Sequence, residues 1–335
     1  MDLFHEFVPN TASVGLADSR CYNTANHIRN GRTTMADFGG VYPAIITPMT
    51  SEGGLNEAAL REVIEFNIQA GVHGFWVAGG TGESVLLDDD ENTRIAEIAS
   101  DQARGRIKNI MHIGAPTTAR AARMAENAAK AGVDAICCIP PFFYKQSDEA
   151  IVEHYRVVAA AADLPFFVYN LPQSTGVEIT PEMMQKIQNG VPQLKGLKHS
   201  APAVANIRAF TKMGLDCFVG NCMLMLPALT IGATGCIDGP PNMAPELWVE
   251  IWNAYNDGDL KRAEEAQDRA SEVGMLIRRF GLHQGVKAAL SERLGIDCGD
   301  PRPPGLPLTI EQRASLARAL AELGLTRVAV AQSGD

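Results

Sequence analysis

Lys198 lies near the end of a short apolar segment that is typical of a β-strand. Side chains alternate along a strand, so Gly196 and Lys198 share one face, whereas Lys195 and Leu197 share the other. If the face with Gly196 lines a closed interior, Lys198 is buried, and burial disfavours its charged ammonium form. A neutral amine can attack a ketone carbon. The alternative interpretation is a lysine that extends along an apolar surface and keeps its amine in solvent.

A glycine-rich segment, Gly79-Gly80-Thr81-Gly82-Glu83-Ser84, follows another strand-like run. Glycines let the backbone turn so that successive N–H groups point at one position, and the Thr81 hydroxyl adds a further donor. This arrangement suits a carboxylate or a phosphate. An ordinary glycine-rich turn explains the same pattern.

Aromatic residues end or follow two further strand-like runs. Tyr169 closes the run 166–169, where a phenol beside an amine can pass protons or can simply pack with its hydroxyl satisfied. The segment Pro140-Pro141-Phe142-Phe143-Tyr144 follows an earlier run and fits either the wall of a pocket or a packed aromatic loop.

Composition limits the partners that this chain can have. The 29 basic and 39 acidic residues give a formal charge of −10, which argues against a nucleic-acid or membrane surface. The seven cysteines include no C-x-x-C pair and mostly lie in apolar runs, which favours buried thiols in the cytoplasm over disulfides. The histidines and carboxylates show no metal-ligand spacing, so neither a metal nor a cofactor is expected.

Eight short apolar runs alternate with helical segments after residue 39, which predicts an α/β fold, a (β/α)₈ TIM barrel. The expected strands are 41–47, 75–78, 110–113, 135–139, 166–169, 194–198, 217–219 and 234–238. The expected helices are 56–70, 91–103, 117–131, 147–162, 181–188, 203–213, 223–231 and 244–256, followed by 260–280, 283–294 and 309–323. Left-handed glycines are expected to end four helices, at Gly71, Gly132, Gly190 and Gly214. A doubly wound open sheet is the alternative.

These segments divide the chain into three regions. Residues 1–38 are expected to be a poorly ordered N-terminal extension, 39–258 the barrel, and 259–335 a C-terminal helical region. Catalytic groups of such barrels lie at the carboxyl ends of the strands. The lysine, the glycine-rich segment and both aromatic segments fall there.

Together these segments resemble the dihydrodipicolinate synthase/N-acetylneuraminate lyase family of class I aldolases. The glycine-rich segment resembles the family's G-x-T-G-E loop, residues 169–176 its Y-N-x-P-x-x-T-G stretch, and residues 196–198 its G-x-K strand. They occur in the family's order, and the resemblance extends over about residues 40–323.

The resemblance implies a Schiff base between Lys198 and the ketone of a 2-oxo acid, with Tyr169 passing the proton and no cofactor involved. It implies that Gly80 and Thr81 hold the substrate carboxylate. The other positions expected to bind substrate are Gly220, Ile237, Phe143, Ser174 and Asp238. A homo-oligomer, a tetramer, is the assembly that the family implies.

Some positions depart from particular branches of the family. Ser174 replaces an arginine that binds the second substrate of dihydrodipicolinate synthases, and Phe143 replaces a tyrosine of their proton relay. Cys222 and Met223 replace an acidic pair of the sialic acid lyases. The turn 279–281 resembles the 4-hydroxy-2-oxoglutarate aldolase branch.

The expected function is therefore a pyruvate-dependent aldolase or lyase that cleaves or forms a C–C bond of a 4-hydroxy-2-oxo acid. The alternatives within the family are 4-hydroxy-tetrahydrodipicolinate synthase, N-acetylneuraminate lyase and a 2-keto-3-deoxy sugar acid dehydratase. A catalytically silent relative that only binds a 2-oxo acid is the alternative from another class.

Overall fold

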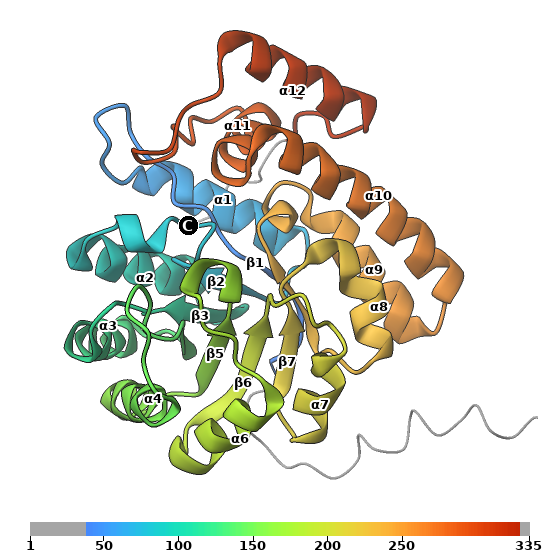
Figure 1. The fold of residues 1–335 in the computed structure, drawn as a ribbon. Coiled ribbons are helices and arrows are strands. Elements are labelled where there is room, and N and C mark those ends of the chain that lie inside the picture. Colours follow the sequence, from blue (N-terminus) through green and yellow to red (C-terminus); the bar gives the residue numbers. More distant parts are fainter. Residues whose placement is uncertain (1–37, 329–335) are drawn as a thin grey trace, which may run out of the picture. The chain divides into compact units, whose positions relative to one another are not determined.

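The computed structural model describes residues 38–328, and nearly all of the expected N-terminal extension lies outside them. Eight parallel strands form one sheet in the order β1-β8-β7-β6-β5-β4-β3-β2 (Figure 1). A parallel bridge between Ala44 and Trp76 joins β1 to β2 and brings the sheet round into a barrel. The strands are β1 Gly40–Pro43, β2 Gly74–Val77, β3 Lys108–His112, β4 Ala135–Cys138, β5 Phe166–Asn170, β6 Leu194–His199, β7 Asp216–Val219 and β8 Gly235–Asp238.

Helices connect successive strands, as the alternating pattern predicts, and the barrel is confirmed against the open sheet. They are α1 Glu57–Gln69, α2 Asp89–Ala103, α3 Thr118–Lys130, α4 Asp148–Ala162, α5 Pro172–Thr175, α6 Pro181–Gly190, α7 Asn206–Lys212, α8 Met225–Thr230 and α9 Pro245–Asp257. Short 3₁₀ turns occur at η1 Ser84–Leu86, η2 Cys222–Leu224 and η3 Pro240–Asn242. The C-terminal region adds α10 Leu260–Phe280, α11 Leu282–Leu294 and α12 Ile310–Glu322.

Three of the four glycines that were expected to end helices have the predicted left-handed backbone. Gly71, Gly132 and Gly214 have φ angles of 86°, 82° and 82°. The expectation for Gly190 is wrong, because this residue is the last of α6. A Cβ atom there would lie 2.6 Å from Val152 Cγ1, so this glycine serves the close packing of α6 on α4.

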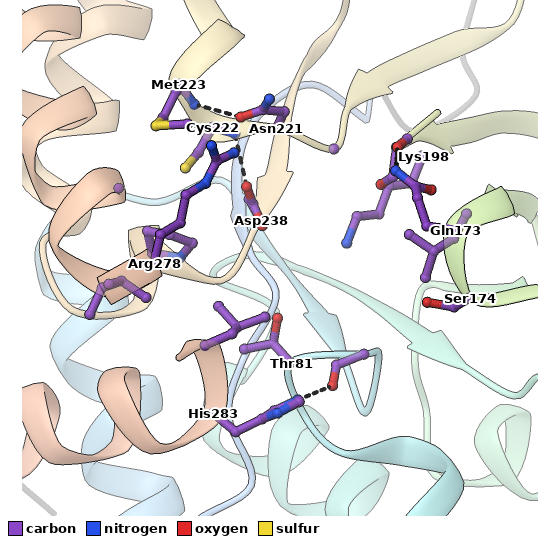
Figure 2. Close-up of a pocket in the computed structure, with 18 of the residues that line it drawn as sticks. Thr81, Gln173, Ser174, Lys198, Asn221, Cys222, Met223, Asp238, Arg278 and His283 are labelled. Carbon is purple, nitrogen blue, oxygen red and sulfur yellow. Dashed lines mark hydrogen bonds between the residues drawn. The ribbon is translucent and has the colours of Figure 1, made fainter. Parts of the chain in front are cut away.

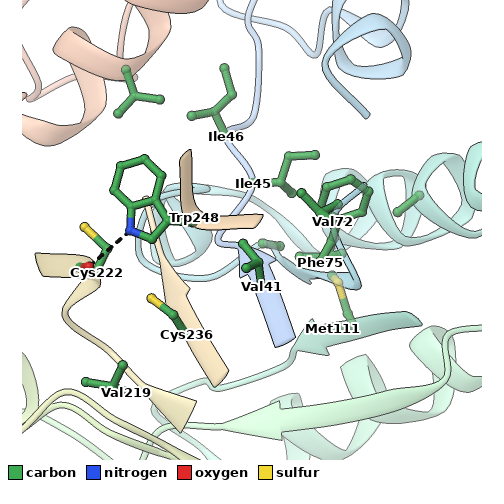
Figure 3. Packing of buried hydrophobic residues seen from close by; sticks show 14 of the residues in the cluster. Val41, Ile45, Ile46, Val72, Phe75, Met111, Val219, Cys222, Cys236 and Trp248 are labelled. Carbon is green, nitrogen blue, oxygen red and sulfur yellow. Dashed lines mark hydrogen bonds between the residues drawn. The ribbon is translucent and has the colours of Figure 1, made fainter. Parts of the chain in front are cut away.

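Apolar side chains fill the space between the sheet and the helices and also the barrel interior. Figure 3 shows Trp248 of α9 in the outer layer, where its Nε1 donates a hydrogen bond of 3.1 Å to the Cys222 carbonyl. This bond holds the turn that follows β7 against α9. The cavity described below is bounded partly by that turn.

Two buried asparagines fix the loops at the carboxyl ends of the strands. Asn242 accepts from the Ile46 amide and donates to the Ala44 and Gly239 carbonyls. Asn170 pairs with both backbone groups of Ile179. Buried amides satisfied in this way hold a loop in one conformation, because an unpaired polar group there would be costly.

The six cysteines of the described residues are free and buried, whereas Cys21 lies outside that part of the chain. Within residues 38–328 no helix is both long and apolar enough to cross a membrane.

Candidate active site

A cavity of about 660 Å³ opens at the carboxyl ends of the strands (Figure 2). It is bounded by the loops after β2, β5, β6, β7 and β8 and by the face of α10 and the start of α11. Its lining includes most of the residues that sequence reasoning selected, namely Gly80, Thr81, Tyr169, Ser174, Lys198, Gly220 and Asp238.

Lys198 lies inside the barrel with only 3% of its surface exposed, and its amine borders the cavity. Its Nζ lies 4.4 Å from the centre of the Tyr169 ring and 5.4 Å from that of Trp76. Lys195 faces the other way and forms an ion pair of 3.1 Å with Asp216. The alternation along β6 therefore separates the two lysines as predicted, and the solvent-extended alternative for Lys198 is wrong.

Tyr169 shares the cavity floor with Lys198. Its ring packs edge-on against Trp76 at 5.4 Å, which holds the phenol in one orientation. A Cβ atom built on Gly80 would lie 3.6 Å from the Tyr169 hydroxyl, so the glycine-rich loop comes close to this hydroxyl. The amine, the phenol and the loop are thus brought together by three different strands.

The loop after β2 is bent sharply between two residues with left-handed backbone. Ala78 and Glu83 have φ angles of 47° and 62°, which non-glycine residues seldom adopt. The Glu83 amide donates to the Gly80 carbonyl at 3.1 Å, and the Thr47 hydroxyl donates to the Gly82 carbonyl at 2.7 Å. Such strain persists only where the surroundings enforce it, and it is often found at functional sites.

The C-terminal region holds this loop through contacts that sequence reasoning missed. The Lys287 Nζ lies 2.5 Å from Glu83 Oε1, and both side chains are 1% exposed. The other Glu83 oxygen accepts from the Arg302 amide at 2.6 Å, and Lys287 donates to the Asp300 carbonyl at 3.0 Å. Burial lowers the pKa of Lys287, and the Glu83 carboxylate opposes this shift. His283 adds a bond of 2.9 Å between its Nε2 and the Gly80 carbonyl.

His112, at the end of β3, is another residue that the sequence did not single out. It is 1% exposed, and neither of its ring nitrogens has a well-aligned hydrogen-bond partner in the structure. Burial, together with the positive charge of Lys198, lowers the pKa of His112 to about 4. The imidazole is therefore neutral near pH 7. The centre of its ring lies 6.1 Å from that of the Tyr169 ring.

Gly220, after β7, and Asp238, at the end of β8, both shape the cavity wall but in different ways. A Cβ atom on Gly220 would lie 1.9 Å from the Ser200 hydroxyl oxygen, so only glycine leaves room for this cavity-lining serine. Asp238 accepts from the amides of Cys222 at 2.9 Å and Gly239 at 2.8 Å, which fixes its carboxylate at the cavity wall.

Two expected substrate contacts are not found at the cavity. Phe143 is 87% exposed, has a left-handed backbone with a φ of 77° and packs against Tyr144. Ile237 is fully buried in the barrel interior and is not among the lining residues, since its side chain belongs to the apolar layer inside the barrel.

Among residues 38–328 no group of three or more His, Cys, Asp or Glu side chains is placed to hold a metal ion. The functional groups that border the cavity include an amine, a phenol, hydroxyls, one carboxylate, one guanidinium, one imidazole, two side-chain amides and one thiol. Such a set is suited to covalent chemistry on a carbonyl compound with an acid-base partner.

Comparison with known proteins agrees with this geometry. A model of the dihydrodipicolinate synthetase family matches residues 37–323. An uncharacterized DapA-like lyase of Halobacterium salinarum is 35% identical over 288 residues, 85% of this chain and 94% of that relative. A 4-hydroxy-tetrahydrodipicolinate synthase of Methanopyrus kandleri is 34% identical, over 85% of this chain and 96% of its own. An N-acetylneuraminate lyase of Escherichia fergusonii is 31% identical, over 75% and 85%.

Solved structures give the same result. A putative dihydrodipicolinate synthetase from Pseudomonas aeruginosa is 30% identical with a TM-score of 0.81, over 86% of this chain and 100% of its own. A prophage protein of the dihydrodipicolinic acid synthase family from E. coli K12, in complex with pyruvate, is 25% identical with a TM-score of 0.81, over 86% and 99%. The fold and these relatives define an enzyme, a lyase built on a (β/α)₈ barrel. The chain belongs to the dihydrodipicolinate synthetase family.

Proposed function

We propose that this lyase forms a Schiff base between Lys198 and a 2-oxo acid. Through it, the enzyme cleaves or forms a C–C bond of a 4-hydroxy-2-oxo acid, with pyruvate as product or donor. The observation that carries the proposal is the position of Lys198, whose buried amine borders the cavity beside Tyr169. Within residues 38–328 this amine forms no ion pair and lies against the Tyr169 and Trp76 rings. The pyruvate complex of the E. coli relative supports the substrate class.

In the cleavage direction the Lys198 amine attacks C2 of the 2-oxo acid, and loss of water gives an imine. The protonated imine draws electrons from the C3–C4 bond as that bond breaks, which leaves an enamine and releases an aldehyde. Tyr169 relays the proton of the 4-hydroxyl group towards C3 of the enamine. Water then hydrolyses the imine, which releases pyruvate and restores the amine.

The loop after β2 holds the substrate carboxylate in this proposal. Thr81 is 4% exposed and lines the cavity, and its hydroxyl lies against Gly239 at the end of β8. A carboxylate held by a hydroxyl and by backbone amides places the neighbouring ketone next to Lys198. Correct placement of two reacting groups is itself a large part of the rate enhancement.

Ser174 and Phe143 favour an aldolase over a synthase. A synthase must hold an anionic second substrate, for which a bidentate arginine is the efficient group, and Ser174 lines the cavity in that place. Phe143 stands where the synthases have a relay tyrosine and has no hydroxyl, and its ring lies outside the cavity of this chain. We expect condensation of pyruvate with aspartate semialdehyde to be negligible beside cleavage of a 4-hydroxy-2-oxo acid.

The experiment is a side-by-side assay of the purified protein on both reactions. Condensation with a kcat/KM of about 10⁴ M⁻¹s⁻¹, an ordinary value for a working enzyme, without any cleavage would contradict the proposal. Loss of water from a 2-keto-3-deoxy sugar acid without release of an aldehyde would identify a dehydratase. Imine formation without turnover of any compound would identify a silent binding protein.

We further propose that the enzyme is a cytoplasmic homotetramer. The buried free thiols suit a reducing compartment. The adjacent Phe143 and Tyr144 side chains are 87% and 72% exposed, and contact between subunits commonly covers such a pair. Sedimentation should give about four times the chain mass of 36.0 kDa, whereas a particle of that mass alone would contradict the assembly.

A further inference from the structure

Arg278 reaches the cavity from the C-terminal helical region. It lies on one face of α10 with Gly274, Ile277 and Gly281, which follow the spacing of three, four and seven residues and all line the cavity. A Cβ atom on Gly274 would lie 2.8 Å from Met223 Cγ, so this glycine lets α10 approach the turn after β7 closely. That close packing sets the position of Arg278 one helical turn further on.

Arg278 has no carboxylate partner within residues 38–328, although most of the other arginines in this part of the chain do. Arg293 and Arg302, for example, form ion pairs of 2.9 and 2.6 Å with carboxylates. Asp238, the carboxylate that borders the cavity, is held instead by two backbone amides. The guanidinium of Arg278 is close enough to the Cys222 thiol to act on it electrostatically, and Figure 2 shows it directed towards that turn.

The cavity thus offers two positions for anionic groups. The loop around Thr81 is the first, and the exposed Arg278 is the second. In the view of Figure 2, Asp238 lies between the Lys198 and Arg278 side chains. The Asp238 carboxylate can accept a hydrogen bond from a hydroxyl group in the middle of a substrate, and it repels an anion. Arg278 is therefore the position that suits a terminal negative charge.

We propose that Arg278 determines specificity by binding a second carboxylate, so that the substrate is a 2-oxo dicarboxylate with a hydroxyl at C4. This inference rests on the function proposed above and narrows its substrate class. The planar guanidinium matches a carboxylate with two parallel hydrogen bonds, which an amine or amide cannot reproduce. The cavity of about 660 Å³ has room for a chain of this length.

The test compares two ligands of equal length, 2-oxoglutarate and 2-oxopentanoate, which differ in the terminal carboxylate. The concentration dependence of borohydride trapping is measured with each ligand and with pyruvate, in the wild type and in Arg278→Gln. The control is Arg279→Gln, because Arg279 is also exposed on α10 but lies 5.7 Å from the Phe280 ring and is not among the lining residues.

In the wild type, 2-oxoglutarate should be trapped at a concentration about ten- to hundredfold lower than 2-oxopentanoate, as a hydrogen-bonded charge pair implies. Arg278→Gln should remove this preference and leave trapping of pyruvate unchanged, while Arg279→Gln should change neither. Equal trapping of both ligands by the wild type, or a preference that survives Arg278→Gln, would overturn the proposal. If pyruvate itself is not trapped, the proposed function fails, which is a different result.

Discussion

Replacing Lys287 by methionine removes the charge of the buried ion pair but keeps the length of the side chain. The Glu83 carboxylate, 1% exposed, then keeps only the Arg302 amide as a partner. Breaking a buried ion pair by removing one partner costs about 3–5 kcal/mol, because the remaining charge stays desolvated. We expect urea unfolding of Lys287→Met to show a free energy of unfolding lower by about that amount.

A surface ion pair between a lysine and an aspartate, with a similar distance, is the control. Lys186 lies 2.8 Å from Asp148, with side-chain exposures of 52% and 50%. Lys186→Met should therefore cost only about 0–1 kcal/mol. The double variant Glu83→Gln/Lys287→Met should recover part of the lost stability. If Lys287→Met costs no more than Lys186→Met, the loop is not held by this ion pair and the reasoning is wrong.

Three further predictions concern the site. Thr81→Ala should lower kcat/KM by about ten- to hundredfold through weaker binding of the 2-oxo acid, while Thr81→Ser should retain most of the kcat/KM value. An unchanged kcat/KM for Thr81→Ala in steady-state assays would show that the substrate carboxylate binds elsewhere. Tyr169→Phe should lower kcat by about 10²–10⁴-fold yet leave pyruvate trapping intact, and single-turnover rates equal to those of the wild type would refute the relay. The pKa values of His112 and His154 are about 4 in the fold because both are buried, against about 6.5 when unfolded. The unfolded chain therefore takes up more protons, and stability should fall as pH decreases from about 6.5 to 4, by at most about 3 kcal/mol for each group. Urea midpoints that do not change across this range would contradict the burial of both imidazoles.

The barrel could be predicted because its signals are local. Most strands are short apolar runs, and several helices begin at a polar cap, such as Asp88 with Glu91 before α2, so these signals do not depend on distant residues. The short helix α5 was missed, since four residues carry no periodicity. Strand β1 ends at Pro43 rather than at residue 47, because beyond it the chain turns to the bridge at Ala44 and to Asn242.

Only part of the candidate site could be predicted from the sequence. The direction of Lys198 follows from alternation along one strand, which is a local property. The partners of Glu83 could not be found in that way, because Lys287 lies about two hundred residues further along the chain and on a helix without motif spacing. Arg278 was missed for the same reason. The exposed Phe143 has a left-handed backbone that no composition rule assigns to phenylalanine.

Borohydride reduction in the presence of pyruvate tests the Schiff base on Lys198 most directly. Trypsin cleaves after unmodified lysines, so a reduced pyruvyl group on Lys198 should block that cut and appear on one peptide, residues 196–208. Lys198→Ala should abolish the label and turnover while remaining folded. Lys195→Ala should keep both, with the label on the longer peptide 187–208, because the cut after residue 195 is lost. A label on Lys195, a label elsewhere, or no label at saturating pyruvate would contradict the account.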